Sequence, residues 1–231
     1  MTTPHILLTG ASRGIGAAIA ETLQARGVRL FAAASADADL STTQGAAELW
    51  DQALDRLDGR VDVLINNAGV FEPSPLDGPE DVWIEQWRRT MTINLEASAL
   101  LCRSAILAWQ AAGVGGRIVN VASRAAYRGD SPAHWHYAAS KAGMVAMTKT
   151  IARGYAAEGI LAFAVCPGFT MTGMAEDYLA SRGGDKLLAD IPLGRVAEPA
   201  EIASICAFMA LDAPPSMTGA VLDANGASYV R

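Results

Sequence analysis

The chain has 231 residues, of which 51% are hydrophobic, and this is enough to bury the core of an ordinary α/β domain. Its formal net charge of -6, without a cluster of lysine and arginine, argues against nucleic acid or an anionic membrane as a partner. We therefore expect one domain over residues 1–231.

The three cysteines, Cys102, Cys166 and Cys206, are odd in number and lack CxxC spacing. This pattern argues against a disulfide framework and a structural zinc site, so we expect buried thiols and no metal site. Met1 is followed almost directly by an apolar stretch over residues 5–9, without a signal segment, and we expect no membrane-spanning run. These features predict a cytoplasmic protein.

The first predicted unit is a strand, a glycine-rich turn and a helix, over residues 5–9, 10–16 and 17–25. Gly10, Gly14 and Gly16 allow the backbone to approach a pyrophosphate, and the helix N-terminus offers N–H groups to it. Such a turn also occurs without any ligand. The spacing G-x-x-x-G-x-G differs from the common G-x-G-x-x-G fingerprint and indicates another family of dinucleotide folds.

A second strand is predicted over residues 28–34, a short third strand over 35–40 and a helix over 45–57. The link between these two strands is too short for a crossover helix, which normally needs about a dozen residues, so either the link is not helical or one of the two strands is misplaced. The carboxylate of Asp39 either accepts a hydrogen bond from an adenine amino group or caps the helix that follows.

A buried strand over residues 61–65 runs into Asn-Asn-Ala-Gly at 66–69, where small residues let the backbone pack under a cofactor. The long helix over residues 81–110 carries Asn94 among alanines and leucines. A buried amide there needs hydrogen-bond partners, or it stabilises a kink in the helix.

Strands over residues 118–123, 160–166 and 220–224 complete the pattern with helices over 137–156 and 198–211 and a mobile lid over 169–191. Strands that alternate with helices in this way predict a single-domain, Rossmann-type doubly wound parallel sheet with helices on both faces.

Tyr137 and Lys141 lie four residues apart, so both project from one face of the predicted helix. A free tyrosine has a pKa near ~10, and acid/base work at neutral pH needs a shift of roughly 3 units. A cation at ~4 Å supplies on the order of 4 kcal/mol at an effective dielectric of about 20, so we expect Lys141 to lower the pKa of Tyr137. Ser123, at the tip of a buried strand, offers a hydroxyl to a substrate oxygen. Taken alone, Tyr-x-x-x-Lys is more often an ordinary turn of a surface helix.

Taken together, these motifs resemble the short-chain dehydrogenase/reductase family over nearly the whole chain. The matching segments are Thr9-Gly10-x-x-x-Gly14-Ile15-Gly16, Asn66-Asn67-Ala68-Gly69, Asn94, Ser123, Tyr137-x-x-x-Lys141 and Pro167-Gly168. The chain is similar in particular to 3-oxoacyl-carrier-protein reductase-like and dihydrodiol dehydrogenase-like members. The resemblance implies hydride transfer between a nicotinamide cofactor and a small-molecule alcohol or carbonyl substrate.

By this resemblance, the catalytic residues are Asn94, Ser123, Tyr137 and Lys141. The residues that it implies for cofactor binding are Gly10, Ser12, Arg13, Gly14, Ile15, Gly16, Asp39, Leu40, Asn66, Ala68, Gly69, Tyr137, Lys141, Pro167, Gly168, Thr170 and Thr172. The family also suggests a homo-oligomer, a tetramer, and the apolar helix over 81–110 favours the same. The alternative is a non-catalytic dinucleotide-binding regulator or scaffold with this fold.

The chain departs from the family pattern in two places, between the second and third strands, where it is short, and over residues 124–136, where it has an extra residue. His134, Trp135 and His136 in the longer loop either contact the substrate or form a packed loop or a subunit contact. Apolar candidates for the pocket walls are Val70, Phe71, Trp135, Phe169, Met171, Met174 and Tyr178.

The choice between NADP and NAD depends on two residues. An NAD site usually has an acidic side chain at the end of the second strand, and here the first carboxylate is Asp37. Arg13 in the glycine turn is placed to pair with the 2′-phosphate of NADP, although it could also be a solvated loop residue. We therefore expect NADP rather than NAD, with Asp37 still within reach of the ribose.

Overall fold

The computed structural model describes residues 3–172 and 188–231. Its described strands form one parallel sheet in the order β2-β1-β3-β4-β5-β6. The strands are β1 (His5–Thr9), β2 (Arg29–Ala33), β3 (Val63–Asn66), β4 (Gly116–Val121), β5 (Ile160–Pro167) and β6 (Val221–Ala224). The strand order reverses between β1 and β3, and in doubly wound sheets ligands bind at the C-terminal ends of the strands beside this point.

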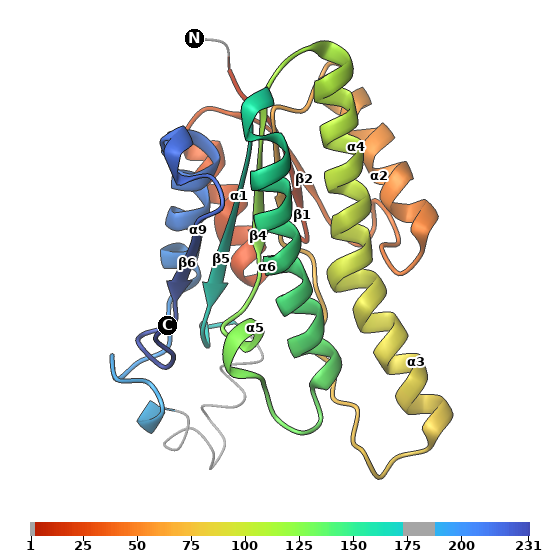
Figure 1. The fold of residues 1–231 in the computed structure, drawn as a ribbon, viewed down its shortest axis with the longest axis vertical. Helices are drawn as coiled ribbons and strands as arrows, with labels where there is room; N and C mark the ends of the chain where they lie inside the picture. Colours follow the sequence, from red (N-terminus) through yellow and green to blue (C-terminus); the bar gives the residue numbers. More distant parts are fainter. Residues whose placement is uncertain (1–2, 173–187) are drawn as a thin grey trace.

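Helices cover both faces of the sheet, as the sequence predicts (Figure 1). One face carries α2 (Thr43–Arg56), α4 (Ala97–Ala112) and α6 (Trp135–Tyr155), and the other carries α1 (Gly14–Ala25) and α9 (Pro199–Ala207). The α/β fold of the Rossmann type is therefore confirmed.

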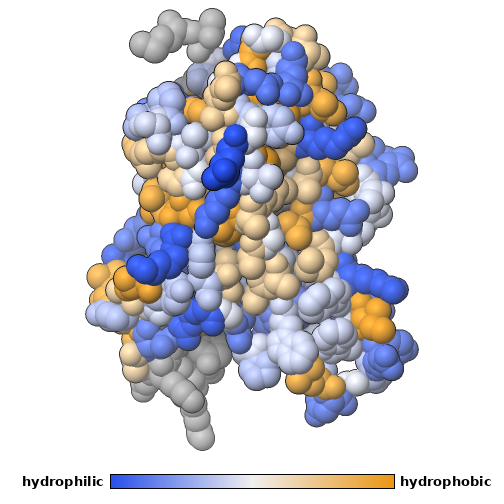
Figure 2. Space-filling view, in the orientation of Figure 1, coloured by the Kyte–Doolittle hydropathy of each residue, from blue (hydrophilic) through white to orange (hydrophobic). Residues whose placement is uncertain are grey.

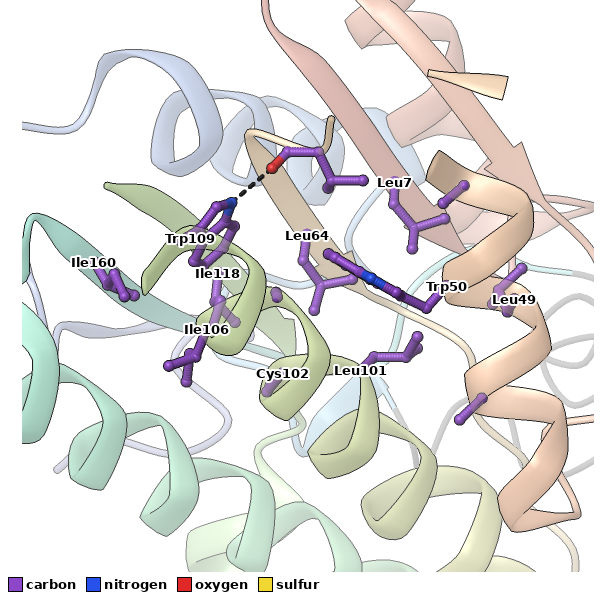
Figure 3. Packing of buried hydrophobic residues seen from close by; sticks show 14 of the residues in the cluster. Leu7, Leu49, Trp50, Leu64, Leu101, Cys102, Ile106, Trp109, Ile118 and Ile160 are labelled. Atoms are coloured by element: carbon purple, nitrogen blue, oxygen red, sulfur yellow. Dashed lines mark hydrogen bonds between the residues drawn. The ribbon is translucent and has the colours of Figure 1, made fainter. Parts of the chain in front are cut away.

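The core between the sheet and the first of these helix layers contains two tryptophan side chains (Figure 3). Trp50 from α2 and Trp109 from α4 pack with Leu64 and Ile118 of the sheet. The indole Nε1 of Trp109 donates a hydrogen bond of 2.6 Å to the carbonyl oxygen of Val61, just before β3. This bond satisfies the polar atom of a buried indole and fixes α4 against the sheet.

The prediction of a third strand over residues 35–40 is wrong, because this segment folds into turns after β2. Asp37 Oδ2 accepts a hydrogen bond of 2.9 Å from Ala34 N, which turns the chain back instead of extending it. Thr42 then caps α2 by accepting a hydrogen bond from Gly45 N. The short connection that the sequence shows is thus a turn, and β2 lies at the edge of the described sheet.

The predicted long helix runs as α3 (Glu80–Met91), a π-helical turn (Thr92–Glu96) and α4. By length and composition alone, this helix over Glu80–Ala112 could cross a membrane, contrary to the expectation from the sequence. Its most apolar window has a mean hydropathy of only 1.2. Leu101 and Trp109 are buried against the sheet, as is usual for the core helix of an α/β domain.

The three cysteines are buried and free, as predicted. Burial raises the pKa of the Cys102 and Cys206 thiols to about 12, so both are inert at neutral pH. The predicted lid over 169–191 lies mostly outside the described residues.

Candidate active site

Asn94 lies inside the π-helical turn and is fully buried. Its side-chain amide pairs with the backbone of Val70 on both sides: Oδ1 accepts from Val70 N at 2.8 Å, and Nδ2 donates to Val70 O at 3.0 Å. Nδ2 also lies 3.3 Å from Ser140 Oγ on α6. A buried amide is stable only when its polar atoms are paired, and this one joins three elements around one point.

Lys141 lies near the Asn94 amide, with Gly69 beside both. Its Nζ donates a hydrogen bond of 2.9 Å to Val121 O at the end of β4, and the residue is buried. A Cβ atom added to Gly69 would be 3.2 Å from Asn94 Oδ1 and 3.5 Å from Lys141 Nζ. Gly69 therefore leaves the space through which the amide and the ammonium approach each other.

Tyr137 and Ser123 meet at the same edge of the sheet. Ser123 follows the end of β4, and its side chain lies close enough to the Tyr137 phenol to lower the pKa of that phenol. Ser123 Oγ also accepts a hydrogen bond of 3.1 Å from Ala125 N at the start of α5 (Ala125–Arg128). The structure thus brings together all four side chains that the family resemblance implies for catalysis.

The expected effect of Lys141 on the phenol is not found. Burial raises the pKa of Tyr137 above its usual value, and the nearby Ser123 only partly opposes this. The Lys141 ammonium is 5.9 Å from the centroid of the tyrosine ring and is bound to a backbone carbonyl instead. At neutral pH the phenol is therefore protonated in this structure.

The glycine turn lies at the end of β1 against the loop that follows β3. Asn67 Nδ2 donates to the carbonyl oxygens of Thr9 (3.1 Å) and Gly10 (2.9 Å). Thr9 Oγ1 accepts hydrogen bonds from the backbone N–H groups of Asn67 and Ala68. A Cβ atom on Gly10 would be 2.7 Å from the Cα atom of Ala68, so only glycine fits this contact.

The N-terminus of α1 offers unpaired backbone donors to a ligand. Arg13 occupies the N-cap position, its side chain makes no capping hydrogen bond, and the first turn contains no acidic residue. Ser12 and Arg13 are exposed, Ile15 packs against the core, and Gly16 is buried under the turn. Such a helix end is suited to bind a phosphate.

The segment after β5 lies over the glycine turn. A Cβ atom on Gly14 would be 3.0 Å from the methyl group of Thr172. Gly168 N donates to Ala224 O at 2.9 Å, and Thr170 forms a bridge with Ala197. Pro167, Gly168, Thr170 and Thr172 are thus placed at the same edge of the sheet as Gly10, Gly14 and Gly16.

Two predicted cofactor residues form side-chain hydrogen bonds elsewhere. Asn66 Nδ2 donates to Asn120 Oδ1 at 2.9 Å and lies 3.3 Å from Cys102 Sγ, inside the core, whereas Asn66 Oδ1 is buried without a hydrogen-bond partner among the described residues. The Asp39 carboxylate accepts from Ser41 N and Ser41 Oγ at 2.9 and 2.6 Å, in the turn before α2. Asp39 is not the N-cap of α2, and Leu40 beside it packs against the core.

His134 at the N-cap of α6 and His136 in its first turn pack against the segment that follows β3. The rings of His134 and Phe71 are stacked, with 3.9 Å between their centroids. The rings of Phe71 and Tyr137 meet edge to face, with 4.7 Å between their centroids. His136 is buried, with Nε2 3.0 Å from Glu72 O, whereas Trp135 is exposed. Of the readings that the sequence leaves open, a packed loop fits the two histidines, and Phe71 forms a wall beside Tyr137. Met174 and Tyr178 lie outside the described residues.

Sequence reasoning missed Asn67 and Ser140, although both stand inside motifs that it singled out. The order of residues does not show that Asn67, and not Asn66, reaches the glycine turn. Within residues 3–172 and 188–231, no group of three or more His, Cys, Asp or Glu side chains is placed to hold a metal ion.

Comparison with known proteins agrees with this geometry. Residues 31–226 match the sequence profile of the family described as enoyl-(acyl carrier protein) reductase. The chain is 34% identical to the 3-oxoacyl-(acyl-carrier-protein) reductase of Vibrio cholerae, over 97% of this chain and 96% of that protein. It is 33% identical to the D-threitol dehydrogenase of Mycolicibacterium smegmatis, over 97% and 92%. It is 31% identical to the acetoacetyl-CoA reductase of Shinella zoogloeoides, over 96% and 97%.

The buried Lys141 predicts a pH dependence of stability. Burial lowers the pKa of Lys141 from 10.5 to about 8, so between these values the unfolded chain binds more protons than the folded one. Stability must therefore rise with pH across this window, relative to a variant without the amine. Between about pH 7 and about pH 9.5, we expect the free energy of unfolding to rise by about 2 kcal/mol more in the parent than in Lys141→Met.

The measurement is denaturation by urea at a series of pH values. Lys149→Met removes an exposed lysine from the same helix, and its curve should run parallel to that of the parent. If the free energy of unfolding of Lys141→Met also changed with pH in parallel with that of the parent, the Lys141 amine would not be charged and buried as described.

Proposed function

The chain belongs to the short-chain dehydrogenase/reductase family, and we propose that within it the protein is an NADP-dependent carbonyl reductase with Asn94, Ser123, Tyr137 and Lys141 as its catalytic residues. It is an oxidoreductase that transfers a hydride between a nicotinamide cofactor and an alcohol/carbonyl pair. The comparisons give no support to the alternative of a non-catalytic scaffold.

The observation that carries the proposal is that the phenol of Tyr137, beside Ser123, is protonated at neutral pH. Burial raises the pKa of Tyr137, so at neutral pH the side chain is an acid that can give a proton to a carbonyl oxygen. Ser123 holds the same oxygen by a hydrogen bond and so orients the carbonyl. These two roles fit reduction, the direction in which two of the three relatives described above are named.

Lys141 and Asn94 support this proton transfer from the side. The Lys141 ammonium, held by Val121 O, stabilises negative charge that develops on the phenol when its proton leaves. Asn94 fixes Val70 and contacts Ser140, and so holds α6 and its Tyr137 at a set distance from the loop after β3.

The residues at the end of β1 fit a dinucleotide. Gly10 and Gly14 keep the turn close to the loop after β3, and the uncapped N-terminus of α1 presents N–H groups that would hold the pyrophosphate. When bound, the nicotinamide cofactor supplies or accepts the hydride. By the family resemblance, Thr170 and Thr172 would bind the carboxamide of the nicotinamide.

The preference for NADP is supported by the two residues on which it depends. Both oxygens of the Asp37 carboxylate are engaged, one with Ala34 N at 2.9 Å and the other with Arg56 at 3.0 Å. A carboxylate so bound is poorly placed to accept a ribose hydroxyl. Arg13 is exposed beside the glycine turn, and the described residues give it no hydrogen-bond or ion-pair partner.

We also propose a cytoplasmic homotetramer that acts on a small molecule. The face over α4 and α6 has a broad hydrophobic area at its centre, with hydrophilic residues around it (Figure 2). Leu107 and Trp135 are 47% and 51% exposed on α4 and α6. Contact with another copy would cover such side chains.

Tyr137→Phe tests the proposed reaction. The variant keeps the ring but loses the proton, so turnover of a carbonyl substrate should fall by a factor of about 10² or more. Cofactor affinity should stay nearly unchanged. The readouts are the absorbance of the reduced nicotinamide during turnover and a fluorescence titration with NADPH, and near-parental turnover would refute the role of Tyr137.

Arg13→Ala tests the cofactor preference. Losing a charged hydrogen bond to the 2′-phosphate should weaken NADP binding by about thirtyfold and leave NAD binding nearly unchanged. The matched control is Arg26→Ala. Arg26 is an exposed arginine that is paired with Asp212, and it lies at the C-terminal end of α1, away from the glycine turn. A parent that prefers NAD, or an equal loss for both cofactors, would reverse the assignment.

A further inference from the structure

Arg124 is a buried arginine directly after Ser123. It is only 9% exposed, and its backbone N donates a hydrogen bond of 2.9 Å to Pro167 O at the end of β5. Its Cα atom is about 3.8 Å from that of Ser123, because the two residues are consecutive. The backbone of Arg124 is therefore held at the catalytic edge of the sheet, between the ends of β4 and β5.

The described residues do not complete the hydrogen bonding of this guanidinium. It lies over the Phe169 ring at 4.7 Å, a cation–π contact. Its Nη1 is 3.7 Å from Asp190 Oδ2, too far for a hydrogen bond, and this oxygen is bound at 2.7 Å by Arg128 instead. Within residues 3–172 and 188–231, Arg124 Nη1 is buried without any hydrogen-bond partner.

The charges around Arg124 leave it in need of an acceptor. Burial lowers the pKa of Arg124 most, and the positive charge of the nearby Arg128 lowers it further. The negative charges of Asp190 and Asp130 raise this pKa, but by less. A guanidinium nevertheless stays charged in proteins, so it cannot relieve this cost by losing a proton. Its planar fork matches the two oxygens of a carboxylate or a phosphate, which would supply the missing partner.

We propose that Arg124 determines substrate specificity by binding an anionic oxygen group, a carboxylate or a phosphate, on the molecule whose carbonyl faces Ser123 and Tyr137. The inference rests on the proposed function and names its substrate class: short oxo acids or oxo phosphates and the corresponding hydroxy compounds. Arg124 directly follows Ser123 and its backbone is anchored to the end of β5, so the proposed substrates are short molecules that carry the anionic group near the carbonyl.

The experiment compares matched charged and neutral substrates. The pairs are pyruvate, acetoacetate and levulinate, each against its methyl ester, and dihydroxyacetone phosphate against dihydroxyacetone. The parent should give a higher kcat/KM for the charged member of at least one pair. In Arg124→Gln this ratio should fall at least tenfold, and in Arg124→Lys by less, because the charge remains without the fork. The carboxylate and phosphate pairs show which anion is used.

The variant Asp190→Asn tests whether Arg124 serves only to anchor the segment around Asp190. Removing that carboxylate takes away a negative charge near Arg124 without breaking a hydrogen bond to it, so the charged-to-neutral ratio should stay or rise. If Arg124 were only an anchor, Arg124→Gln and Asp190→Asn would lower both members of a pair equally. Arg29→Gln, at the start of β2 on the opposite edge of the sheet, is the control for a change of net charge.

Calorimetric binding separates this inference from the proposed function. In the presence of NADP, the preferred anion should bind to the parent at least tenfold more tightly than to Arg124→Gln. If the parent turns over no carbonyl compound but shows this difference, the proposed reaction fails and the anion site stands. If no acid or phosphate is preferred to its neutral partner in turnover or in binding, the anion site is overturned.

Discussion

The hydrogen-bonded pair between the Asn94 amide and the Val70 backbone is the constraint on which the rest of the site depends. Asn94 reaches Val70 from a π-helical turn, where the helix is widened by one residue, and it touches Ser140 on α6 from the same position. Three elements are thus fixed to one another at the point where the strand order reverses. π-helical turns are frequent at functional sites because they re-aim one side chain without ending a helix.

This arrangement is maintained at a cost in stability. Lys141 keeps a buried ammonium with one backbone acceptor, and burial lowers its pKa to about 8. Arg124 keeps a buried guanidinium with an unpaired nitrogen. Both cations lie at the C-terminal edge of the sheet, whereas Arg26 and Arg29, away from this edge, are exposed and paired with Asp212 and Asp58. Unpaired buried charge is therefore concentrated where substrate and cofactor would meet it.

Much of the fold could be predicted because it follows from local pattern: alternating apolar strands and helices, and glycines where the backbone must turn or approach closely. The absence of the short third strand could not be predicted, since reciprocal hydrogen bonds between Ala34 and Asp37 favour the turn over a strand. The pKa of Tyr137 was expected to fall because spacing puts Lys141 on the same helix face, but spacing does not reveal burial or the carbonyl of Val121 that takes the ammonium. The direction of the Asn66 side chain and the missing partner of Arg124 likewise depend on tertiary contacts that neighbouring residues in the sequence do not specify.

The central claim is that Asn94 and Tyr137 act as parts of one unit, and a double-mutant cycle on kcat tests it most directly. Groups that act together are not additive, so the double variant Asn94→Ala, Tyr137→Phe should be about as slow as Tyr137→Phe alone. Circular dichroism on each variant establishes that the chain is folded. If instead the two losses multiply in the double variant, Asn94 does not work through the position of Tyr137, and the account of the site given above is contradicted.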